Sequence, residues 1–461
     1  MLRVHFFFLL LITALPACSS YTPDMALRNA VERADYATAR TRLQANIAAA
    51  DKREREYVLD NVRLGMVNLA AGNAAAAEPP FFETFMTLRR QGINDDQTVA
   101  ASFLGENGVI FWKGEPFEQA LAFTYTAIDY AELGQWDNTR AAASASLFQL
   151  KNFGDVERGA DKGQRKTKED VAEEAARCEQ QKPGSYERYL DHGYTPTKTN
   201  FALGYLMAGL ANYALSVADT DRLAEAQDNF REAFTLNPGL RDVADRVLSG
   251  QANTILVVDY GRGPEKVRYG PDGSLSRYDP RTPSDGRRLL VQFAGGQPIA
   301  FSTACDVNEM ALDQMWNAFE DVRKAKSVIG DFFVAGGLIT AGTGLGRERA
   351  KERTAQTLAG VAAVAIGAAL KASAAADLRQ NEILPQRTYV AAINIAPGSG
   401  PVTISVEGDA GSGLNISGLA PPPKGELLTL HYVRIPVAGS AYQPPPIDPR
   451  DTRSRRGTFR R

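Results

Sequence analysis

Apolar residues recur every three or four positions through the first half of the chain, which is the spacing of one helix face. Residues 25–50 carry this pattern and are predicted to form one helix. A second helix is predicted to begin near Val58. It should end near Gly72, because a glycine followed by asparagine readily takes the left-handed conformation that terminates helices. Residues 25–150 are therefore expected to be helices separated by turns.

Two segments have the pattern of paired helices. Residues 117–150 hold one helix, a break at residues 134–137 and a second helix rich in alanine. This unit has about the 34 residues of a tetratricopeptide repeat (TPR). A second unit covers residues 201–236, where small Ala233 permits close helix packing. Since stacked helix pairs bury their apolar faces only against neighbouring pairs, we predict a TPR-like array over residues 25–250.

The pattern changes after Gly250, where runs of β-branched residues replace helical spacing. These runs predict strands at residues 254–260, 289–293, 299–303, 389–395, 402–406 and 427–435. A stretch rich in Pro, Gly, Asp and Ser at residues 271–287 is predicted to be a loop. The fold class is thus mainly α: a TPR-like helical-repeat array followed by a smaller α+β part over residues 251–435. The Pro- and Arg-rich tail, residues 436–461, is predicted to be disordered.

A Gly/Ala-rich helical hairpin is predicted at residues 306–380, between the strands. It contains two uncharged stretches, residues 332–346 and 354–370, separated by charged residues. Three interpretations stay open: a buried antiparallel helix pair, a self-association surface, or a hairpin that enters a membrane. Gly360 and Gly367 leave one helix face bare, which permits close packing in each case. We favour the buried pair, because each stretch is shorter than the roughly 20 residues that span a bilayer.

The N-terminus has the layout of a bacterial secretory signal, with Arg3, an apolar run at residues 6–12 and a small residue before Cys18. The sequence Leu15-Pro16-Ala17-Cys18 resembles a lipobox, in which the cysteine becomes the lipidated first residue of a lipoprotein. An ordinary secretory signal with an incidental cysteine is the alternative.

A lipobox predicts a signal peptide at residues 1–17, a lipidated linker at residues 18–24 and a mature protein outside the cytoplasm. Ser19 follows the cysteine. A serine there resembles the pattern of outer-membrane lipoproteins, so we expect an outer-membrane lipoprotein that faces the periplasm and meets the membrane through lipid at Cys18.

The composition excludes several classes of function. The 461 residues have a formal net charge of −2, so no bulk attraction to nucleic acid is expected. Cys178 and Cys305 are the cysteines that remain after Cys18, and an oxidising periplasm allows them to pair. His192 and His431, the histidines beyond the predicted signal peptide, lack metal-ligand spacing. We therefore expect no catalytic residue, metal or cofactor.

The clearest short motif is Trp-Lys-Gly-Glu-Pro-Phe-Glu at residues 112–118. Glu115 and Glu118 resemble a carboxylate pair for acid–base chemistry. However, Pro116 suits the first position of a helix, and Glu118 in the first turn complements the helix dipole. No nucleophile adjoins the motif, so we interpret it as a helix start.

Partner-binding residues would be aromatic or charged groups exposed on the concave face of the array. The candidates are Trp112, Glu115, Tyr125, Tyr130 and Trp136. Aromatic residues at helical spacing otherwise pack inside the core. Farther along the chain, the Gly261-Arg262-Gly263-Pro264 turn follows a predicted strand, but it lacks the third glycine and the following helix of a dinucleotide-binding loop.

Several motifs together resemble an uncharacterised family of bacterial TPR-like envelope lipoproteins. They are residues 112–118 with the helix that follows, Val257-Val258-Asp259-Tyr260 with Gly261, Gly263, Pro264 and Lys266, and Ala376-Asp377-Leu378-Arg379 with Leu384-Pro385. The resemblance covers residues 20–435 discontinuously. It implies an anchored lipoprotein with this architecture, and it implies no reaction.

These observations predict a non-enzymatic, lipid-anchored scaffold that binds other envelope proteins through a TPR-like surface. Two alternatives stay open. One is an oligomeric envelope component that uses the Gly/Ala-rich hairpin for self-association or membrane insertion. The other is an enzyme acting on a cell-envelope polymer, with carboxylates assembled from distant parts of the sequence.

Overall fold

The computed structural model describes most of the predicted helical and α+β parts. The described residues are 24–50, 56–89, 112, 114–151, 201–269, 275–281, 288–312, 378–407 and 413–435. The first helices are α2 (Met25–Glu32) and α3 (Tyr36–Ala49), so the prediction of one helix over residues 25–50 is wrong. Ala34 takes a left-handed conformation with φ 57° between them. Asp35 then starts α3 by accepting a hydrogen bond from the Thr38 amide at 3.1 Å.

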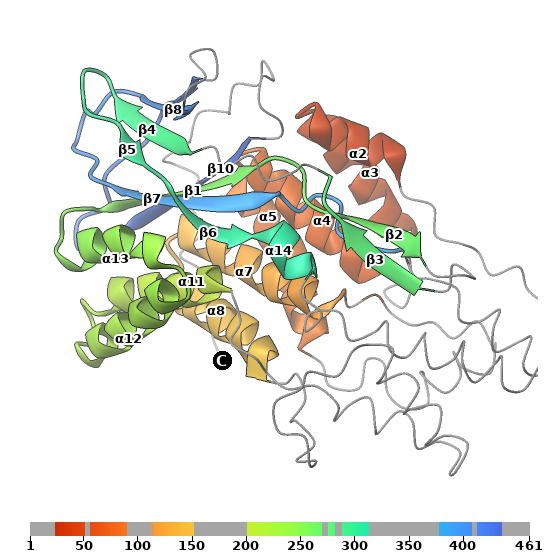
Figure 1. Cartoon of the computed structure of the whole chain (residues 1–461), viewed down its shortest axis with the longest axis horizontal. Coiled ribbons are helices and arrows are strands. Elements are labelled where there is room, and N and C mark those ends of the chain that lie inside the picture. Colours follow the sequence, from red (N-terminus) through yellow and green to blue (C-terminus); the bar gives the residue numbers. More distant parts are fainter. Residues whose placement is uncertain are drawn as a thin grey trace, which may run out of the picture.

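The remaining helices of the first half stack in pairs (Figure 1). The pairs are α4 (Tyr57–Ala70) with α5 (Ala74–Leu88), α7 (Pro116–Glu132) with α8 (Trp136–Lys151), and α11 (Ala202–Leu215) with α12 (Asp221–Leu236). Each pair also contacts the next, through α5 with α7 and through α8 with α11. Gly72 and Gly134 have positive φ where α4 and α7 end, as predicted.

A central four-stranded sheet follows the helices, in the order β10-β1-β7-β6. Its strands are β1 (Thr254–Tyr260), β6 (Ser302–Asp306), β7 (Arg387–Ile393) and β10 (Thr429–Ile435). Strands β1 and β10 are parallel, whereas β7 is antiparallel to both β1 and β6. The predicted strand at residues 299–303 is divided between two sheets, because Ile299–Ala300 forms β5 and the chain re-pairs from Ser302 onward.

Two smaller sheets complete the β structure. A second sheet has the order β5-β4-β8-β9, with β4 (Leu289–Phe293), β8 (Val402–Val406) and β9 (Leu414–Ile416). A hairpin joins β2 (Glu265–Tyr269) to β3 (Leu275–Asp279). Strand β3 lies in the stretch predicted to be a loop, because pairing with β2 overrides its turn-rich composition. Short helical segments η1 (Pro238–Leu240), α13 (Arg241–Leu248) and α14 (Val307–Leu312) connect these elements.

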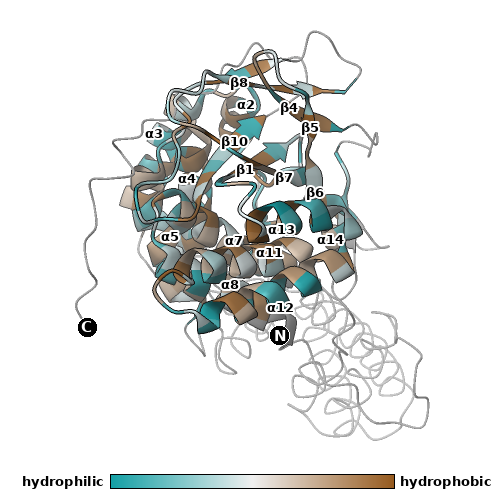
Figure 2. Ribbon diagram, turned by 90° about the vertical axis from the view of Figure 1, so that its left-hand side faces the viewer, coloured by the Kyte–Doolittle hydropathy of each residue, from teal (hydrophilic) through white to brown (hydrophobic). Residues whose placement is uncertain are grey.

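The central sheet is covered on both faces, which gives three layers (Figure 1). Alternate residues of β1 point to opposite faces. Ile255 and Val257 pack with the helices, whereas Leu256 and Val258 pack against the second sheet. Helices α4 and α7 contact β10, and α11 contacts β6. Figure 2 shows α7 and α11 between the sheet and the outer helices α8 and α12.

One hydrophobic core therefore runs from α2 to β10. Residue 250 marks the change from helix to strand, and the helical part and the α+β part share this core. The predicted hairpin at residues 306–380 begins with α14 and otherwise lies largely outside the described residues. Residues 378–380, predicted to be helical, have irregular structure. None of the helices in the described ranges has the length and apolar content needed to cross a membrane.

The helix pairs make close contacts between a glycine and a phenylalanine. A Cβ atom added to Gly65 of α4 would lie 2.7 Å from the Phe81 ring of α5. A Cβ atom added to Gly209 of α11 would lie 2.6 Å from the Phe230 ring of α12. Both rings are fully buried, so they have little space to move. These two glycines therefore set the close approach of their helix pairs.

We predict that Gly65→Ala and Gly209→Ala each lower the free energy of unfolding by about 1–2 kcal/mol, because overpacking outweighs the better helix propensity of alanine. Thermal or urea unfolding measures this. Gly400→Ala is the control, since a Cβ at Gly400 meets nothing within 4 Å, and its change should stay within about 0.5 kcal/mol. Equal stability of all three variants would contradict the predicted helix contacts.

Candidate functional site

The candidate site is a buried ionic cluster at the start of α7. Lys266 of β2 places its Nζ 2.8 Å from Oε1 of Glu115, the residue that precedes α7. The two side chains are only 4% and 2% exposed. The Tyr278 ring of β3 lies against the same ammonium, with 5.4 Å between Nζ and the ring centroid. The β2–β3 hairpin is thus held to the N-terminus of α7 by a buried charge pair.

Glu118, one turn into α7, joins three parts of the chain. Its Oε2 accepts hydrogen bonds from the Glu115 amide at 2.9 Å and from the Tyr278 hydroxyl at 3.0 Å. Its Oε1 accepts a hydrogen bond from the Asn381 amide at 2.7 Å. The predicted helix start is confirmed, since Pro116 is the first helical residue and Glu118 bonds back to the preceding amide. The same carboxylate also binds the hairpin and a segment more than two hundred residues away.

That segment, residues 378–386, is called the strap here. The strap is irregular yet almost wholly buried, and it includes Arg379, Gln380, Asn381, Glu382 and Gln386. Buried polar groups require hydrogen-bond partners. The partners of the strap lie on several other elements of the fold.

The strap is fixed at both ends by hydrogen bonds to its backbone, one of them from a side chain. The Gln380 carbonyl accepts from Arg63 Nη2 of α4 at 2.9 Å. The Gln386 amide donates to the Tyr260 carbonyl at 3.0 Å, and the Leu384 carbonyl accepts from the Gly263 amide at 2.9 Å. A Cβ at position 263 would lie 2.5 Å from that carbonyl oxygen, which explains the glycine.

A second buried charge group supports the strap from α4. Arg63 forms an ion pair with Asp60 at 2.8 Å and a closer one with Glu382 of the strap. The Arg63 and Glu382 side chains are 2% and 4% exposed. Removing one member of such a group leaves an uncompensated buried charge, which typically costs about 3–5 kcal/mol. The strap is therefore held in one position by charge as well as by hydrogen bonds.

Burial governs the protonation of Glu118. Desolvation raises its pKa from the ordinary 4.5 to about 7, although Lys266 and the amides of Asn381 and Glu115 act in the opposite direction. Glu118 thus exchanges a proton near neutral pH. The raised pKa of Glu132, about 8, also results from burial.

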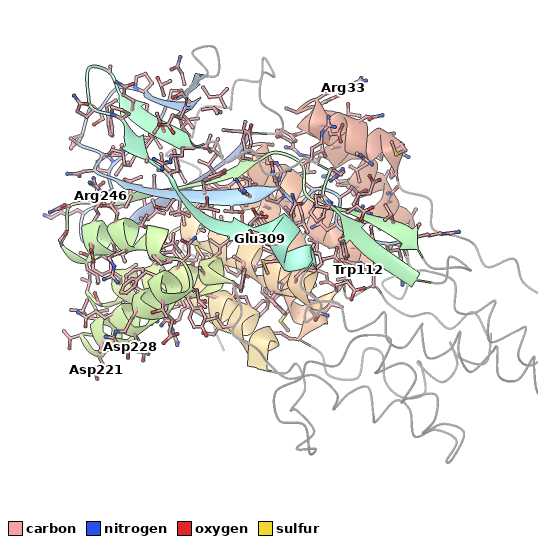
Figure 3. The ribbon with its side chains drawn as sticks, viewed as in Figure 1. Arg33, Trp112, Asp221, Asp228, Arg246 and Glu309 are labelled. Atoms are coloured by element: carbon pink, nitrogen blue, oxygen red, sulfur yellow. The ribbon has the colours of Figure 1, made fainter. Side chains whose placement is uncertain are left out.

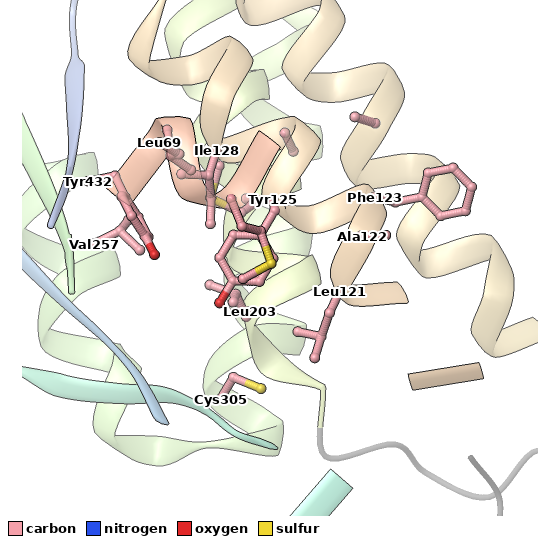
Figure 4. Packing of buried hydrophobic residues seen from close by; sticks show 14 of the residues in the cluster. Leu69, Leu121, Ala122, Phe123, Tyr125, Ile128, Leu203, Val257, Cys305 and Tyr432 are labelled. Atoms are coloured by element: carbon pink, nitrogen blue, oxygen red, sulfur yellow. The ribbon is translucent and has the colours of Figure 1, made fainter. Parts of the chain in front are cut away.

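A third buried group centres on Asp259 of β1. Its Oδ2 accepts from the hydroxyls of Tyr125 at 2.6 Å and Tyr432 at 2.7 Å, and its Oδ1 accepts from Thr388 Oγ1 at 2.6 Å. Arg434 Nη1 lies 3.5 Å from Oδ2. Figure 4 shows Tyr125 of α7 and Tyr432 of β10 at the interface between helix and sheet. Burial raises the pKa of Asp259, while Arg434 and the three hydroxyls favour its charged form.

All five candidate partner-binding residues lie inside the protein. Tyr125 is fully buried, and Trp112, Glu115, Tyr130 and Trp136 are between 2% and 7% exposed. Glu115 and Tyr125 belong to the groups described above, and Trp112 packs against Gly114. Exposure on a concave face was the condition for partner binding. The structure does not meet it, because all five side chains are packed inside the protein.

The other residues selected from the sequence have different outcomes. Cys18, Cys178 and His192 lie outside the described residues. Cys305 is a buried free thiol that donates to Met310 Sδ at 3.1 Å, and burial raises its pKa well above the usual range. Burial lowers the pKa of His431 to about 4, so it is neutral at physiological pH. Within the described ranges, no group of His, Cys, Asp and Glu is arranged to hold a metal.

Sequence reasoning missed the roles of Asp259, Lys266, Tyr278 and Asn381. Asp259 carried a signal, because a charged residue inside a β-branched strand must find a buried partner. Lys266 and Asn381 are ordinary in their local sequence. Yet parts of the three motifs, residues 114–118, 263–266 and 378–385, converge at this site, a proximity that no local pattern encodes.

Comparison of the chain with protein families, with curated proteins and with solved structures finds no match in any of the three.

We predict that Glu118→Gln changes how stability depends on pH. A carboxyl whose folded pKa is raised stabilises the folded state fully below its unfolded pKa and loses that contribution as pH rises through the folded pKa. Relative to Glu118→Gln, the parent protein should lose on the order of 3 kcal/mol between pH 4.5 and about 7, with no further change above. Urea unfolding of both proteins across this range measures the difference.

Glu225→Gln is the control for that experiment. Glu225 lies on α12 with a side chain 50% exposed, so its replacement should leave the pH dependence unchanged. A stability difference between parent and Glu118→Gln that stays constant from pH 4.5 to 7 would show that Glu118 is ionised throughout.

Proposed function

We propose that the protein is a lipid-anchored, periplasm-facing component of the outer membrane that acts as a non-enzymatic scaffold for other envelope proteins. The observation that carries the proposal is the position of Cys18 directly after Leu15-Pro16-Ala17, at the end of a secretory-type apolar segment. Lipid on Cys18 would hold the folded layers at the membrane surface.

The partner surface in this proposal lies on the outside of the helical layer. The inner helices α4, α7 and α11 contact the protein's own sheet, and every residue of α4 is buried. The TPR-like stacking therefore leaves the outer helices for a partner. Helix α12 presents charged residues there, with Asp221 and Asp228 at its outer edge (Figure 3). Complementary charge on a partner would favour rapid and selective association.

The buried carboxylates support a structural role. Glu115, Glu118, Asp259 and Glu382 are each at most 7% exposed, and their contacts join separate elements of the fold. A carboxylate that acts on a large envelope polymer must reach that polymer. The carboxylates assembled here from distant sequence instead connect the helices, the hairpin and the strap.

An oligomeric envelope component is the second candidate function. Asp306 at the end of β6 pairs with Arg387 at the start of β7, at 2.7 Å between Nε and Oδ2. The chain between them therefore leaves and re-enters the central sheet at one end. The Gly/Ala-rich sequence of that insertion would then be available for self-association or membrane contact without disturbing the sheet.

We predict that Cys18→Ser leaves the fold intact and releases the protein from the membrane fraction, because each buried lipid methylene contributes about 0.8 kcal/mol to anchoring. Fractionation with immunodetection measures the distribution. Cys178→Ser is the matched control and should stay in the pellet. Retention of Cys18→Ser in the pellet would place the anchor elsewhere, with the Gly/Ala-rich insertion as the first region to examine.

Gly360→Leu and Gly367→Leu distinguish the scaffold from the oligomer. We expect both to lower the melting temperature of the monomer, because close helix approach is lost, with no binding to liposomes. A lower oligomer mass with an unchanged monomer would favour the second function. Light scattering, thermal melting and liposome flotation of one set of variants give these readouts.

A further inference from the structure

Two buried acidic residues, Asp129 and Glu132, lie in the last turn of α7, at the opposite end of the helix from Glu118. Asp129 is 0% exposed and Glu132 is 8% exposed. The backbone amide of Tyr432 in β10 donates a hydrogen bond to the Glu132 carboxyl group, and Glu78 of α5 lies close enough to Asp129 to act on its charge. The two residues therefore lie where α7 meets both α5 and β10.

Most oxygen atoms of these two side chains have no hydrogen-bond donor. Both carboxyl oxygens of Asp129 and Oε2 of Glu132 are buried, and they accept no hydrogen bond within the part of the chain that the structure describes. A buried carboxylate without donors is costly, whereas a protonated carboxyl group bears no charge and has an O–H donor of its own. This environment therefore favours the protonated form at both positions.

The other buried carboxyl groups of the described residues each have a cation beside them. The cation is Lys266 for Glu115 and Glu118, Arg63 for Asp60 and Glu382, and Arg434 for Asp259. The charged groups that act on Asp129 are instead two further carboxylates, those of Glu132 and Glu78. Asp129 and Glu132 thus differ from every other buried acidic residue in the described ranges.

The elements packed against α7 bring no compensating charge to this end of the helix within the described residues. Asp60 and Arg63 of α4 pair with each other, Arg434 of β10 lies beside Asp259, and α11 has no charged side chain. A Cβ atom at Gly134, in the turn after α7, would lie 3.9 Å from Oε2 of Glu426, which is another carboxylate. The free carbonyl groups at a helix C-terminus add partial negative charge. The same elements also carry four residues that are not among the groups acting on Asp129 or Glu132: Glu83, Asp137, Arg140 and His431.

The protonation of both residues is coupled to the packing of the helix end. Burial raises the pKa of Asp129 well above its usual range, and the Glu132 and Glu78 carboxylates raise it further. Burial raises the pKa of Glu132 from the ordinary 4.5 to about 8, although the Tyr432 amide acts in the opposite direction. Both groups regain their ordinary pKa values when the helix end is released into water. Release therefore loses protons, and rising pH favours it between pH 4.5 and about 8.

We propose that Asp129 and Glu132 form a pH-sensitive switch whose ligand is the proton. While both side chains are protonated, the C-terminal end of α7 stays packed against α5 and β10. As the pH rises, ionisation of the two side chains releases this end together with the turn that leads to α8. Each carboxyl group that is neutral when packed and ionised when released makes release about tenfold more favourable for each pH unit. The switch requires no lipid at Cys18, so it is independent of the scaffold proposal.

Hydrogen exchange of the full-length protein in detergent, measured by mass spectrometry, tests the switch. Amide protection, corrected for the intrinsic effect of pH on exchange, reports how often each segment opens. Between about pH 5.5 and 7.5, residues 126–135 should lose protection at least about tenfold for each pH unit. Helix α12, whose carboxylates are exposed, should keep its protection. Constant protection of residues 126–135 would overturn the proposal, and so would an equal loss on α12, which would indicate unfolding of the whole protein.

Variants assign the effect to the two residues. The double variant Asp129→Asn with Glu132→Gln removes both titrating groups at nearly unchanged size, and protection of residues 126–135 should then be independent of pH. If it does not fold, Glu132→Gln alone decides, with a loss per pH unit about tenfold smaller than in the parent protein. Glu225→Gln on α12 is the matched control and should behave like the parent protein. An unchanged pH dependence in the folded double variant, or in Glu132→Gln, would overturn the assignment.

Glu118→Gln separates this switch from the carboxyl group at the other end of α7. Residues 126–135 should lose protection with pH in that variant as they do in the parent protein. Disappearance of the pH dependence in Glu118→Gln would assign the effect to Glu118 and overturn the proposal.

Discussion

The buried carboxylate of Asp259 is the interaction that fixes the helical layer on the central sheet. Its oxygens accept hydrogen bonds of 2.6–2.7 Å from hydroxyl groups on α7, β7 and β10, and Arg434 lies close by. Apolar packing between helix and sheet is not directional, so it permits many relative positions. A carboxylate that accepts three short hydrogen bonds permits only one relative position of helix and sheet. Because it lies inside the core, its contacts are stronger than at a surface, and an unpaired alternative is costly.

A second constraint acts at the N-terminal end of α7, where the strap passes between α4, α7 and the β2–β3 hairpin. The strap has no regular structure, so neighbouring elements must satisfy its polar groups. Glu118, Arg63 and Gly263 do so. This explains how the central sheet tolerates a long insertion between β6 and β7. The chain that returns from it is fixed in place before it enters β7.

The same contacts change where a partner would bind. In an open array of helix pairs, the inner helices form the concave surface that receives another protein. In this protein that surface is covered by the chain itself, because the central sheet packs on α4, α7 and α11. The aromatic residues that would anchor a partner became core residues. The charged outer side of α12 stays exposed.

The sequence by itself determined most of the local structure. Periodicity predicted α4, α7, α8, α11 and α12 with their glycine or proline ends, and β-branched runs predicted β1, β4 and β8. These signals are local, so a short window contains them. Tertiary structure decided the rest. Pairing with β2 made a strand from the turn-rich residues 275–279, and a break at Ala34 divided the first helix. The meeting of Glu118, Lys266 and Asn381 also required the fold, because a buried charge selects its partner by proximity in space, and spacing along the chain does not record that proximity.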